Sequence, residues 1–203
     1  MSSNTQEIES KYYVRDLKTI EARLVAQGAT SKLARSFEYN LRFDDPQSSL
    51  AHQHHVLRLR KSDDVRLTFK GPGEQQSGAI VRTELELVVD DFEMARKFLE
   101  ALGYTAVISY EKYRAMYKFE EALVTLDELP YGNFVEIEAG HANVIAGLAQ
   151  RLGLRAENAI PASYLGLFEH IRLTKGLQAQ NLAFHEFEGL QISAADLGVV
   201  PAD

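Results

Sequence analysis

Charged and apolar residues alternate in a series of short segments along the chain. In the first segment Glu7, Glu9 and Lys11 fall on one side, and Ile8 and Tyr12 fall on the other. Successive side chains of a β-strand point to opposite faces, so this pattern predicts a strand with one charged face and one apolar face. We predict strands at residues 7–14, 37–43, 56–60, 65–70, 80–89, 106–118, 122–128 and 134–138.

Other segments carry apolar residues at helical spacing. They predict helices over residues 17–27, 91–102, 142–152 and 163–171. Polar loops are expected at 46–54 and 71–78. The last thirty or so residues show no clear periodicity, although their apolar residues suggest a segment that docks back on the rest. We therefore divide the chain into a domain at 1–170 and an extension at 171–203.

The charged faces of the strands are too orderly for an ordinary solvated sheet. Acids and bases fall into separate, strand-sized groups, and five of the bases are arginine, whose planar fork suits phosphate. The acids are Glu7, Glu9, Glu84, Glu86, Asp127, Glu136 and Glu138. The bases are Lys11, Arg58, Arg60, Arg66, Lys70, Arg82, Lys112 and Arg114.

A closed barrel accounts for both faces of these strands. The charged faces would line the lumen, and the amphipathic helices would cover the apolar faces outside. Buried charges are costly unless they pair with each other or bind a charged ligand. Acids and bases together suit an anion that arrives with metal ions, such as a triphosphate with Mg²⁺ or Mn²⁺. The fold class is therefore α+β, an eight-stranded antiparallel barrel with a charged lumen.

Composition restricts the partners and the cellular location that we expect for this protein. The formal net charge of -7 argues against a nucleic-acid partner. No cysteine is present, which excludes disulfides, thiolate metal sites and a cysteine nucleophile. No apolar run is long enough to cross a membrane, and the N-terminus has no signal-peptide pattern. We expect a cytoplasmic protein, and a homodimer stays open.

At this point the motifs match a known family. Over about residues 7–170 the chain resembles the CYTH superfamily, the triphosphate tunnel metalloenzymes, which include class IV adenylate cyclases and thiamine triphosphatases. Seven motifs stand in the family's order: Glu7-x-Glu9-x-Lys11, Leu57-Arg58-Leu59-Arg60, Leu67-Thr68-Phe69-Lys70-Gly71-Pro72, Arg82-x-Glu84-x-Glu86, Lys112-x-Arg114, Leu126-Asp127 and Phe134-x-Glu136-x-Glu138.

The resemblance implies an eight-stranded tunnel that binds a triphosphate, and it assigns roles to residues. Metal ligands would be Glu7, Glu9, Asp127, Glu136 and Glu138. Phosphate-binding residues would be Lys11, Arg58, Arg60, Lys70, Arg82, Lys112 and Arg114. As catalytic residues we take Glu9, Lys11, Lys112 and Arg114. The general base is unassigned between Glu9 and the pair Glu136 and Glu138.

Two reactions fit the same tunnel. In a cyclase the ribose 3′-hydroxyl of ATP attacks the α-phosphorus, and in a triphosphatase water attacks a terminal phosphorus. Three motifs look like those of the cyclase branch: Lys112-x-Arg114, Gly71-Pro72 and Ser163-Tyr164. The second strand departs from that branch, because Glu38, Asn40 and Arg42 stand where typical cyclases have Gln-x-Asp-x-Tyr. Cyclase is our first expectation, a hydrolase of tripolyphosphate or an organic triphosphate is the second, and an inert binding module is the third.

Several residues have simpler interpretations. Glu84 and Glu86 are expected to orient arginines. His52, His54 and His55 belong to a solvated or substrate-entry loop rather than a metal site. Residues 71–78 lack the Gly-Lys-Ser/Thr of a P-loop and are interpreted as a hairpin loop. Tyr164 is expected to be packed rather than catalytic.

Overall fold

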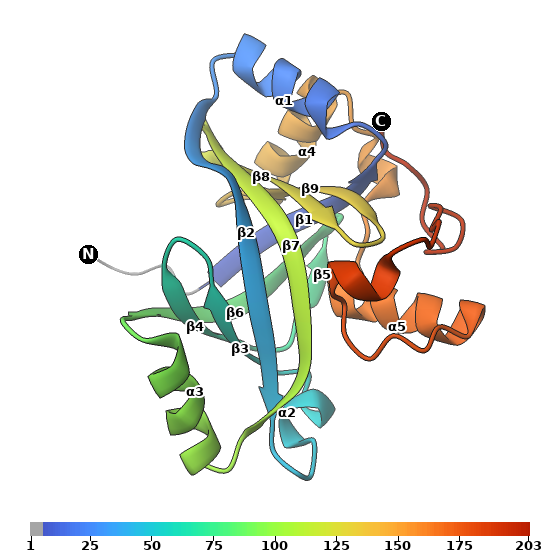
Figure 1. Cartoon of the computed structure of the whole chain (residues 1–203). Helices are drawn as coiled ribbons and strands as arrows, with labels where there is room; N and C mark the ends of the chain where they lie inside the picture. The colour runs from blue at the N-terminus through green and yellow to red at the C-terminus, as the bar shows by residue number, and fades with distance from the viewer. Residues whose placement is uncertain (1–5) are drawn as a thin grey trace.

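Nine strands form one sheet that curves into a ring in the computed structural model, which describes residues 6–203 (Figure 1). Every strand pairing is antiparallel, and β1 pairs with both β9 and β6, which closes the ring. The strands are β1 (Gln6–Val14), β2 (Thr30–Asp44), β3 (Val56–Lys61), β4 (Val65–Lys70), β5 (Glu74–Gln76), β6 (Ala79–Val89), β7 (Thr105–Phe119), β8 (Ala122–Leu129) and β9 (Gly132–Glu138). The three-residue β5 lies outside the closed ring, paired only with β6.

Strand register places the charged faces next to one another. Lys11 of β1 is opposite Glu136 of β9, and Lys112 of β7 is opposite Glu38 of β2. Residues directly opposite on neighbouring antiparallel strands share a face. The alternating charges of the sequence therefore gather on the inner face of the ring, as predicted.

Helices cover much of the outer face (Figure 1). Helices α1 (Leu17–Ala26) and α4 (Ala142–Arg151) pack over the apolar side of β1, β8 and β9. The Asp16 side chain caps α1 by accepting from the Lys18 N–H. Helix α3 (Phe92–Ala101) packs on β2 and β3 through Phe92 and Leu99. Helix α5 (Tyr164–Lys175) packs on the part of the ring that contains Tyr110, Leu129 and Phe134.

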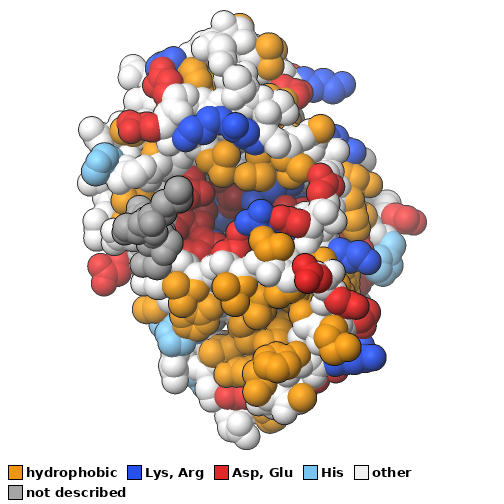
Figure 2. All heavy atoms as spheres, turned by 90° about the vertical axis from the view of Figure 1, so that its left-hand side faces the viewer, with side chains coloured by type: hydrophobic (Ala, Val, Ile, Leu, Met, Phe, Trp, Pro, Cys, Tyr) orange, Lys and Arg blue, Asp and Glu red, His pale blue; other side chains and the backbone are white. Residues whose placement is uncertain are grey.

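One part of the outer face lacks the helical cover that the sequence predicted. On β6, Leu85 is 49% exposed and Leu87 is 63% exposed, and on α3 Met94 and Phe98 are also exposed. Figure 2 shows a hydrophobic area on this side of the molecule, below the mouth of a charged hollow. The strand alternates as expected, but α3 turns its covering residues toward β2 and β3 instead of β6.

The structure also corrects several element boundaries. The second strand begins at Thr30 rather than residue 37, with register shifts along its pairing to β7. The predicted loop at 46–54 contains a short helix, α2 (Ser49–His52), and the predicted loop at 71–78 contains β5. None of the helices in residues 6–203 is long and apolar enough to span a bilayer.

The C-terminal segment, residues 176–203, packs against the ring through backbone hydrogen bonds. The Leu182 N–H donates to the Ser109 carbonyl (3.1 Å), and the Leu182 carbonyl accepts from the Glu111 N–H (2.9 Å). The side chains of Leu182, Phe187 and Leu197 are buried against α5 and β7. This segment thus lies directly behind Tyr110, the residue between Ser109 and Glu111. The division of the chain at residue 170 stays a prediction.

Candidate functional site

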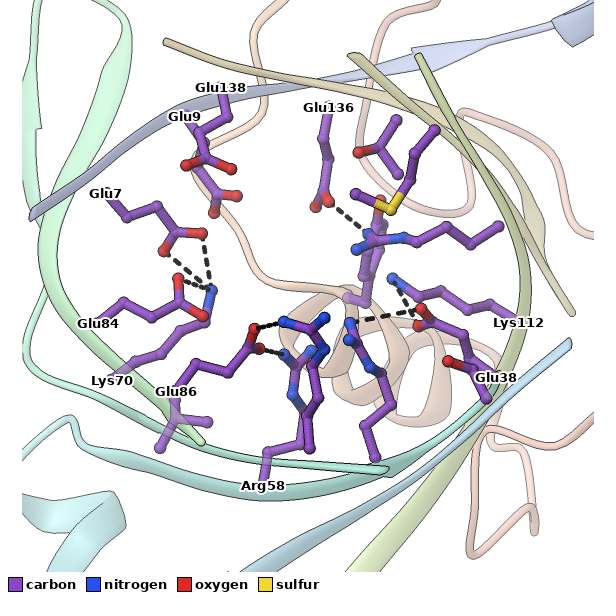
Figure 3. Close-up of a pocket in the computed structure, with 18 of the residues that line it drawn as sticks. Glu7, Glu9, Glu38, Arg58, Lys70, Glu84, Glu86, Lys112, Glu136 and Glu138 are labelled. Carbon is purple, nitrogen blue, oxygen red and sulfur yellow. Dashed lines mark hydrogen bonds and ion pairs between the residues drawn. The ribbon is translucent and has the colours of Figure 1, made fainter. Parts of the chain in front are cut away.

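A cavity of about 1080 Å³ lies inside the ring and opens to the surface (Figure 2). Its walls come from strands on all sides of the ring, and Ser163, Tyr164 and Leu165 at the start of α5 also line it. The volume is at the upper end of the range for small-molecule sites, about 300–1,000 Å³. Figure 3 shows carboxylate and amine side chains pointing into this space from around the ring.

One stretch of the cavity wall carries the glutamates of β1, β6 and β9. Glu7 accepts from Lys70 Nζ at 2.9 Å and from Arg82 Nε at 2.8 Å. Burial disfavours the ionised carboxylate, but Lys70 and Arg82 outweigh it and lower the pKa of Glu7 to about 2. Glu84 shares Lys70 with Glu7 at 3.1 Å. Burial and the neighbouring Glu7 raise the pKa of Glu84 to about 7, although Lys70 acts in the opposite direction.

Glu9 and Glu138 form the least compensated acidic pair of the wall. They are directly opposite on β1 and β9, an arrangement that like charges destabilise. Arg82 donates to Glu9 (2.7 Å), whereas the side chain of Glu138 has no hydrogen bond or ion pair within residues 6–203. Burial and repulsion from Glu136 and Glu7 raise the pKa of Glu9. Burial and repulsion from Glu7 and Glu9 likewise raise the pKa of Glu138.

These acids fit a hard divalent cation. No three carboxylate or imidazole groups of the described chain already converge on one ligating position. Even so, Glu9 and Glu138 supply oxygen donors and uncompensated negative charge at one point of the wall, and Glu7 and Glu136 are near enough to shift their pKa values. Mg²⁺ and Mn²⁺ commonly bind through a few carboxylates together with oxygens of a phosphate substrate.

The neighbouring stretch of wall, on β7 and β8, contains a buried ionic network. Asp127, which is 0% exposed, accepts from Lys112 Nζ (3.0 Å), Arg114 Nε (2.7 Å) and the Tyr164 hydroxyl (2.8 Å). Arg114 also donates to Glu136 (2.7 Å). Asp127 is therefore covered by these partners and does not line the cavity, whereas the other predicted metal ligands do. Its geometry is that of a residue that holds Lys112 and Arg114 in place.

Glu136 and Glu38 each lie close to several bases and offset part of their positive charge. Glu136 lies 3.3 Å from Lys11 Nζ, and Lys11 and Arg114 lower its pKa well below the ordinary value despite burial. Glu38 is 1% exposed and lies 3.5 Å from Arg60 and 3.6 Å from Lys112 (Figure 3). Burial acts against its ionisation, yet these bases with Arg114 and Arg58 lower the pKa of Glu38 to about 2.

The arginines of β3 complete the basic wall. Arg58 donates to the Tyr110 hydroxyl (3.3 Å) and to Thr68 Oγ1 (3.2 Å), and lies 3.9 Å from Glu86. Glu86 makes a closer pair with Arg66 at 2.5 Å. Glu86 therefore holds arginines in position, as the sequence suggested.

Comparison with known proteins identifies the family of this fold. The family model described as the CYTH domain matches residues 5–164, most of the chain. The chain belongs to the CYTH family. Adenylate cyclase CyaB of Aeromonas hydrophila is 30% identical over 176 residues, which cover 80% of this chain and 88% of that protein.

Solved structures show the same fold. A protein from Vibrio parahaemolyticus aligns with a TM-score of 0.75 and 22% identity, over 82% of this chain and 99% of that one. The Hippeastrum protein HpAC1, described as having a dominant triphosphatase activity, aligns with a TM-score of 0.59 and 18% identity, over 80% of this chain and 95% of that one.

The CYTH cavity brings together nearly all the site residues that the sequence indicated. It is lined by Glu7, Glu9, Lys11, Arg58, Arg60, Lys70, Arg82, Lys112, Arg114, Glu136 and Glu138. Asp127 shares the inner face with Arg114, its register partner, but it is fully buried and does not line the cavity, and neither do His52, His54 and His55. The roles of these residues in metal binding, phosphate binding and catalysis stay predictions.

Some cavity residues were outside the predicted set. Glu38 and Arg42 were noticed only as departures from a motif, yet both line the cavity. Tyr110 also lines it, and the alternation of β7, with Lys112 and Arg114 on the same face, could have indicated this. Tyr164 is packed as expected, but it also lines the cavity, and Lys11 Nζ lies 4.3 Å from its ring centroid.

Proposed function

We propose that this CYTH protein is a divalent-metal-dependent enzyme that acts on a triphosphate inside a charged tunnel. The observation that carries the proposal is the separation of charge around one cavity. Glu9 and Glu138 are left without enough positive charge on one stretch of wall, while arginines of β2, β3 and β7 line another. A triphosphate with its metal ion supplies both missing partners at once.

The preferred form of the proposal is an adenylate cyclase, which converts ATP to cyclic AMP and pyrophosphate. The relative at 30% identity carries that name. An apolar patch also supports a nucleoside, since Leu33, Met116 and Leu123 line the cavity. Leu33 and Met116 are register partners, and Leu123 is opposite Glu138. A nucleoside could contact this patch while its phosphates contact the charged wall.

The carboxylates would hold Mg²⁺ or Mn²⁺, and the candidates in the cavity wall are Glu7, Glu9, Glu136 and Glu138. The bound ion would supply charge neutralisation and a more acidic nucleophile. In the cyclase reaction the 3′-oxygen bonds to the α-phosphorus, the bond to the bridging oxygen breaks, and pyrophosphate leaves with that electron pair. The released proton needs an acceptor. The carboxylates of Glu9, Glu136 and Glu138 in the cavity wall are the candidates.

The basic residues would orient the phosphate chain and stabilise the charge that develops on it. Three of these bases lie near the carboxylates that would bind metal. Lys11 and Arg114 contact Glu136, and Lys112 contacts Asp127. Because these carboxylates fix the three bases before substrate arrives, little reorganisation is needed during the reaction. Arg58, Arg60, Lys70 and Arg82 would bind the rest of the phosphate chain.

A triphosphatase is the second candidate, and one observation favours it. The second strand places Glu38 and Arg42 in the cavity wall where the cyclase pattern has other residue types, and Arg42 adds positive charge. A wholly anionic substrate, such as tripolyphosphate, would use that additional charge. The fold also occurs in HpAC1, which is described as having a dominant triphosphatase activity.

One assay distinguishes the candidates. The purified protein is incubated with ATP or tripolyphosphate and Mg²⁺ or Mn²⁺, and cyclic AMP, pyrophosphate and orthophosphate are quantified. Cyclic AMP with pyrophosphate supports the cyclase, whereas orthophosphate without cyclic AMP supports the hydrolase. Tight binding without turnover supports an inert module and refutes the enzyme. Glu128→Gln, which removes a carboxylate paired with Arg35 outside the cavity, is the control for Glu9→Gln.

A further inference from the structure

Arg42 of β2 differs from every other arginine in the cavity wall. Its side chain lines the cavity, is half-buried, and has no hydrogen bond or ion pair within residues 6–203. Its Nε atom is fully buried without an acceptor; the same holds for Arg58 and Arg60, but those two also have carboxylate partners. A buried donor without a partner costs free energy, so native structures rarely keep one unless a ligand or solvent satisfies it.

The remaining cavity arginines of the described chain are each matched by a carboxylate. Arg60 lies 3.5 Å from Glu38, and Arg82 donates to Glu7 and Glu9. The others pair as Arg58 with Glu86, Arg66 with Glu86 and Asp64, and Arg114 with Asp127 and Glu136. The guanidinium donors of Arg42 are thus available to a ligand, whereas those of the other arginines already contact acids.

The neighbours of Arg42 make its isolation more costly. Arg58 is directly opposite Arg42 on β3, so two guanidinium groups face the same part of the cavity. Burial and repulsion from Arg58 lower the pKa of Arg42, with Tyr110 acting in the opposite direction. The Tyr110 hydroxyl is hydrogen-bonded to Arg58 at 3.3 Å. A shift in register between β2 and β7 falls between Arg42 and Phe43, at the point where a bulge can redirect a side chain.

We propose that Arg42, Arg58 and Tyr110 form an oxyanion subsite that binds one phosphoryl group of the substrate's phosphate chain. This inference rests on the proposed function of the cavity as a triphosphate site. Two guanidinium groups and a hydroxyl present several donors to one tetrahedral anion, which has an acceptor oxygen for each. The anion would satisfy the orphaned donor of Arg42 and remove its repulsion with Arg58. Arg42 would thereby select for substrates whose phosphate chain reaches this part of the wall.

Binding of tripolyphosphate in EDTA, measured by titration calorimetry, tests the subsite without requiring turnover. Arg42→Gln should weaken binding about 10- to 100-fold, the range expected when a hydrogen bond to a charged group is lost. Arg42→Lys, which keeps the charge but not the fork, should restore part of the loss. Arg35→Gln is the matched control, because it removes the same charge from the same strand at an exposed pair with Glu128.

The thermal midpoint of the ligand-free variants separates binding from structure. Arg42→Gln should leave it unchanged or raise it, because the substitution removes an unpaired charge next to Arg58. If Arg42→Gln bound tripolyphosphate as tightly as the wild type does, the subsite would be overturned, but the proposed function would stand. The subsite would also be overturned if Arg42→Gln bound weakly only because its thermal midpoint had fallen. Wild-type protein that binds tripolyphosphate without turning over any triphosphate would refute the enzyme, yet a loss in Arg42→Gln would still support the subsite.

Discussion

Asp127→Asn is expected to destabilise the fold rather than remove a metal ligand. In the wild type, Asp127 is fully buried and accepts from Lys112, Arg114 and Tyr164. The asparagine is similar in shape but carries no charge, so two buried cations lose a partner. Removing one member of a buried ion pair costs about 3–5 kcal/mol.

The remaining partners place the cost at the lower end of this range. Lys112 still lies 3.6 Å from Glu38, and Arg114 keeps its 2.7 Å contact with Glu136. We therefore expect a loss of about 3 kcal/mol in the free energy of unfolding. For a chain of this length that corresponds to a melting temperature lower by about 6–12 °C.

Glu138→Gln is the informative comparison for this prediction. Glu138 has no ion pair within the described chain and faces Glu9, so its neutralisation should not lower the melting temperature. It should instead weaken Mn²⁺ binding, measured by titration calorimetry in the presence of tripolyphosphate. If Asp127→Asn kept the wild-type melting temperature and lost Mn²⁺ binding as fully as Glu138→Gln, the structural role of Asp127 would be refuted and direct ligation supported.

Three further predictions follow from the pairing of the cavity side chains. Glu9→Gln should lower metal-dependent turnover by about 10- to 100-fold. The melting temperature should not fall, because the raised pKa of Glu9 means that its charge does not stabilise the fold. Full activity in the variant would exclude Glu9 from the site. Glu38, whose pKa is lowered from 4.5 to about 2, should add about 3 kcal/mol to the free energy of unfolding above pH 4.5, and this contribution should be lost as the pH falls toward 2. Urea unfolding should then show that the stability of Glu38→Gln declines less steeply in acid than that of the wild type. Tyr164→Phe, which removes one donor to Asp127, should cost about 1–2 kcal/mol by the same unfolding assay, and an unchanged stability would mean that this hydrogen bond contributes nothing.

The alternation of charge in the sequence predicted the eight strands of the closed ring, though not β5 or the start of β2, and the face of each strand that lines the cavity. Glu7, Glu9 and Lys11 show why, since a period of two residues fixes which side chains share a face. Helix positions followed from the spacing of apolar residues, as for α1. These features are local, so the sequence expresses them directly.

Features that depend on the pairing of distant strands were not predictable in the same way. Whether Arg42 has an acidic partner depends on which residues of β3 and β7 lie opposite it, and the register places Arg58 and Ile108 there. Asp127 has a charge pattern like that of a metal ligand, but α5 brings Tyr164 over it and β7 brings two bases. The docking of the C-terminal segment through Leu182 uses backbone groups, which leave no signature in side-chain type.

The strength of the internal ion pairs indicates where a phosphate chain can bind with least disruption. A ligand must compete with the carboxylates that already hold each base. The contacts of Asp127 with Lys112 and Arg114 are short and buried, so these bases are suited to holding their positions. The acid contacts of Arg58 and Arg60 are longer, at 3.5–3.9 Å, and Arg42 has none to any acid in residues 6–203. The wall formed by β2 and β3 is therefore the part of the cavity most ready to exchange its internal partners for phosphate oxygens.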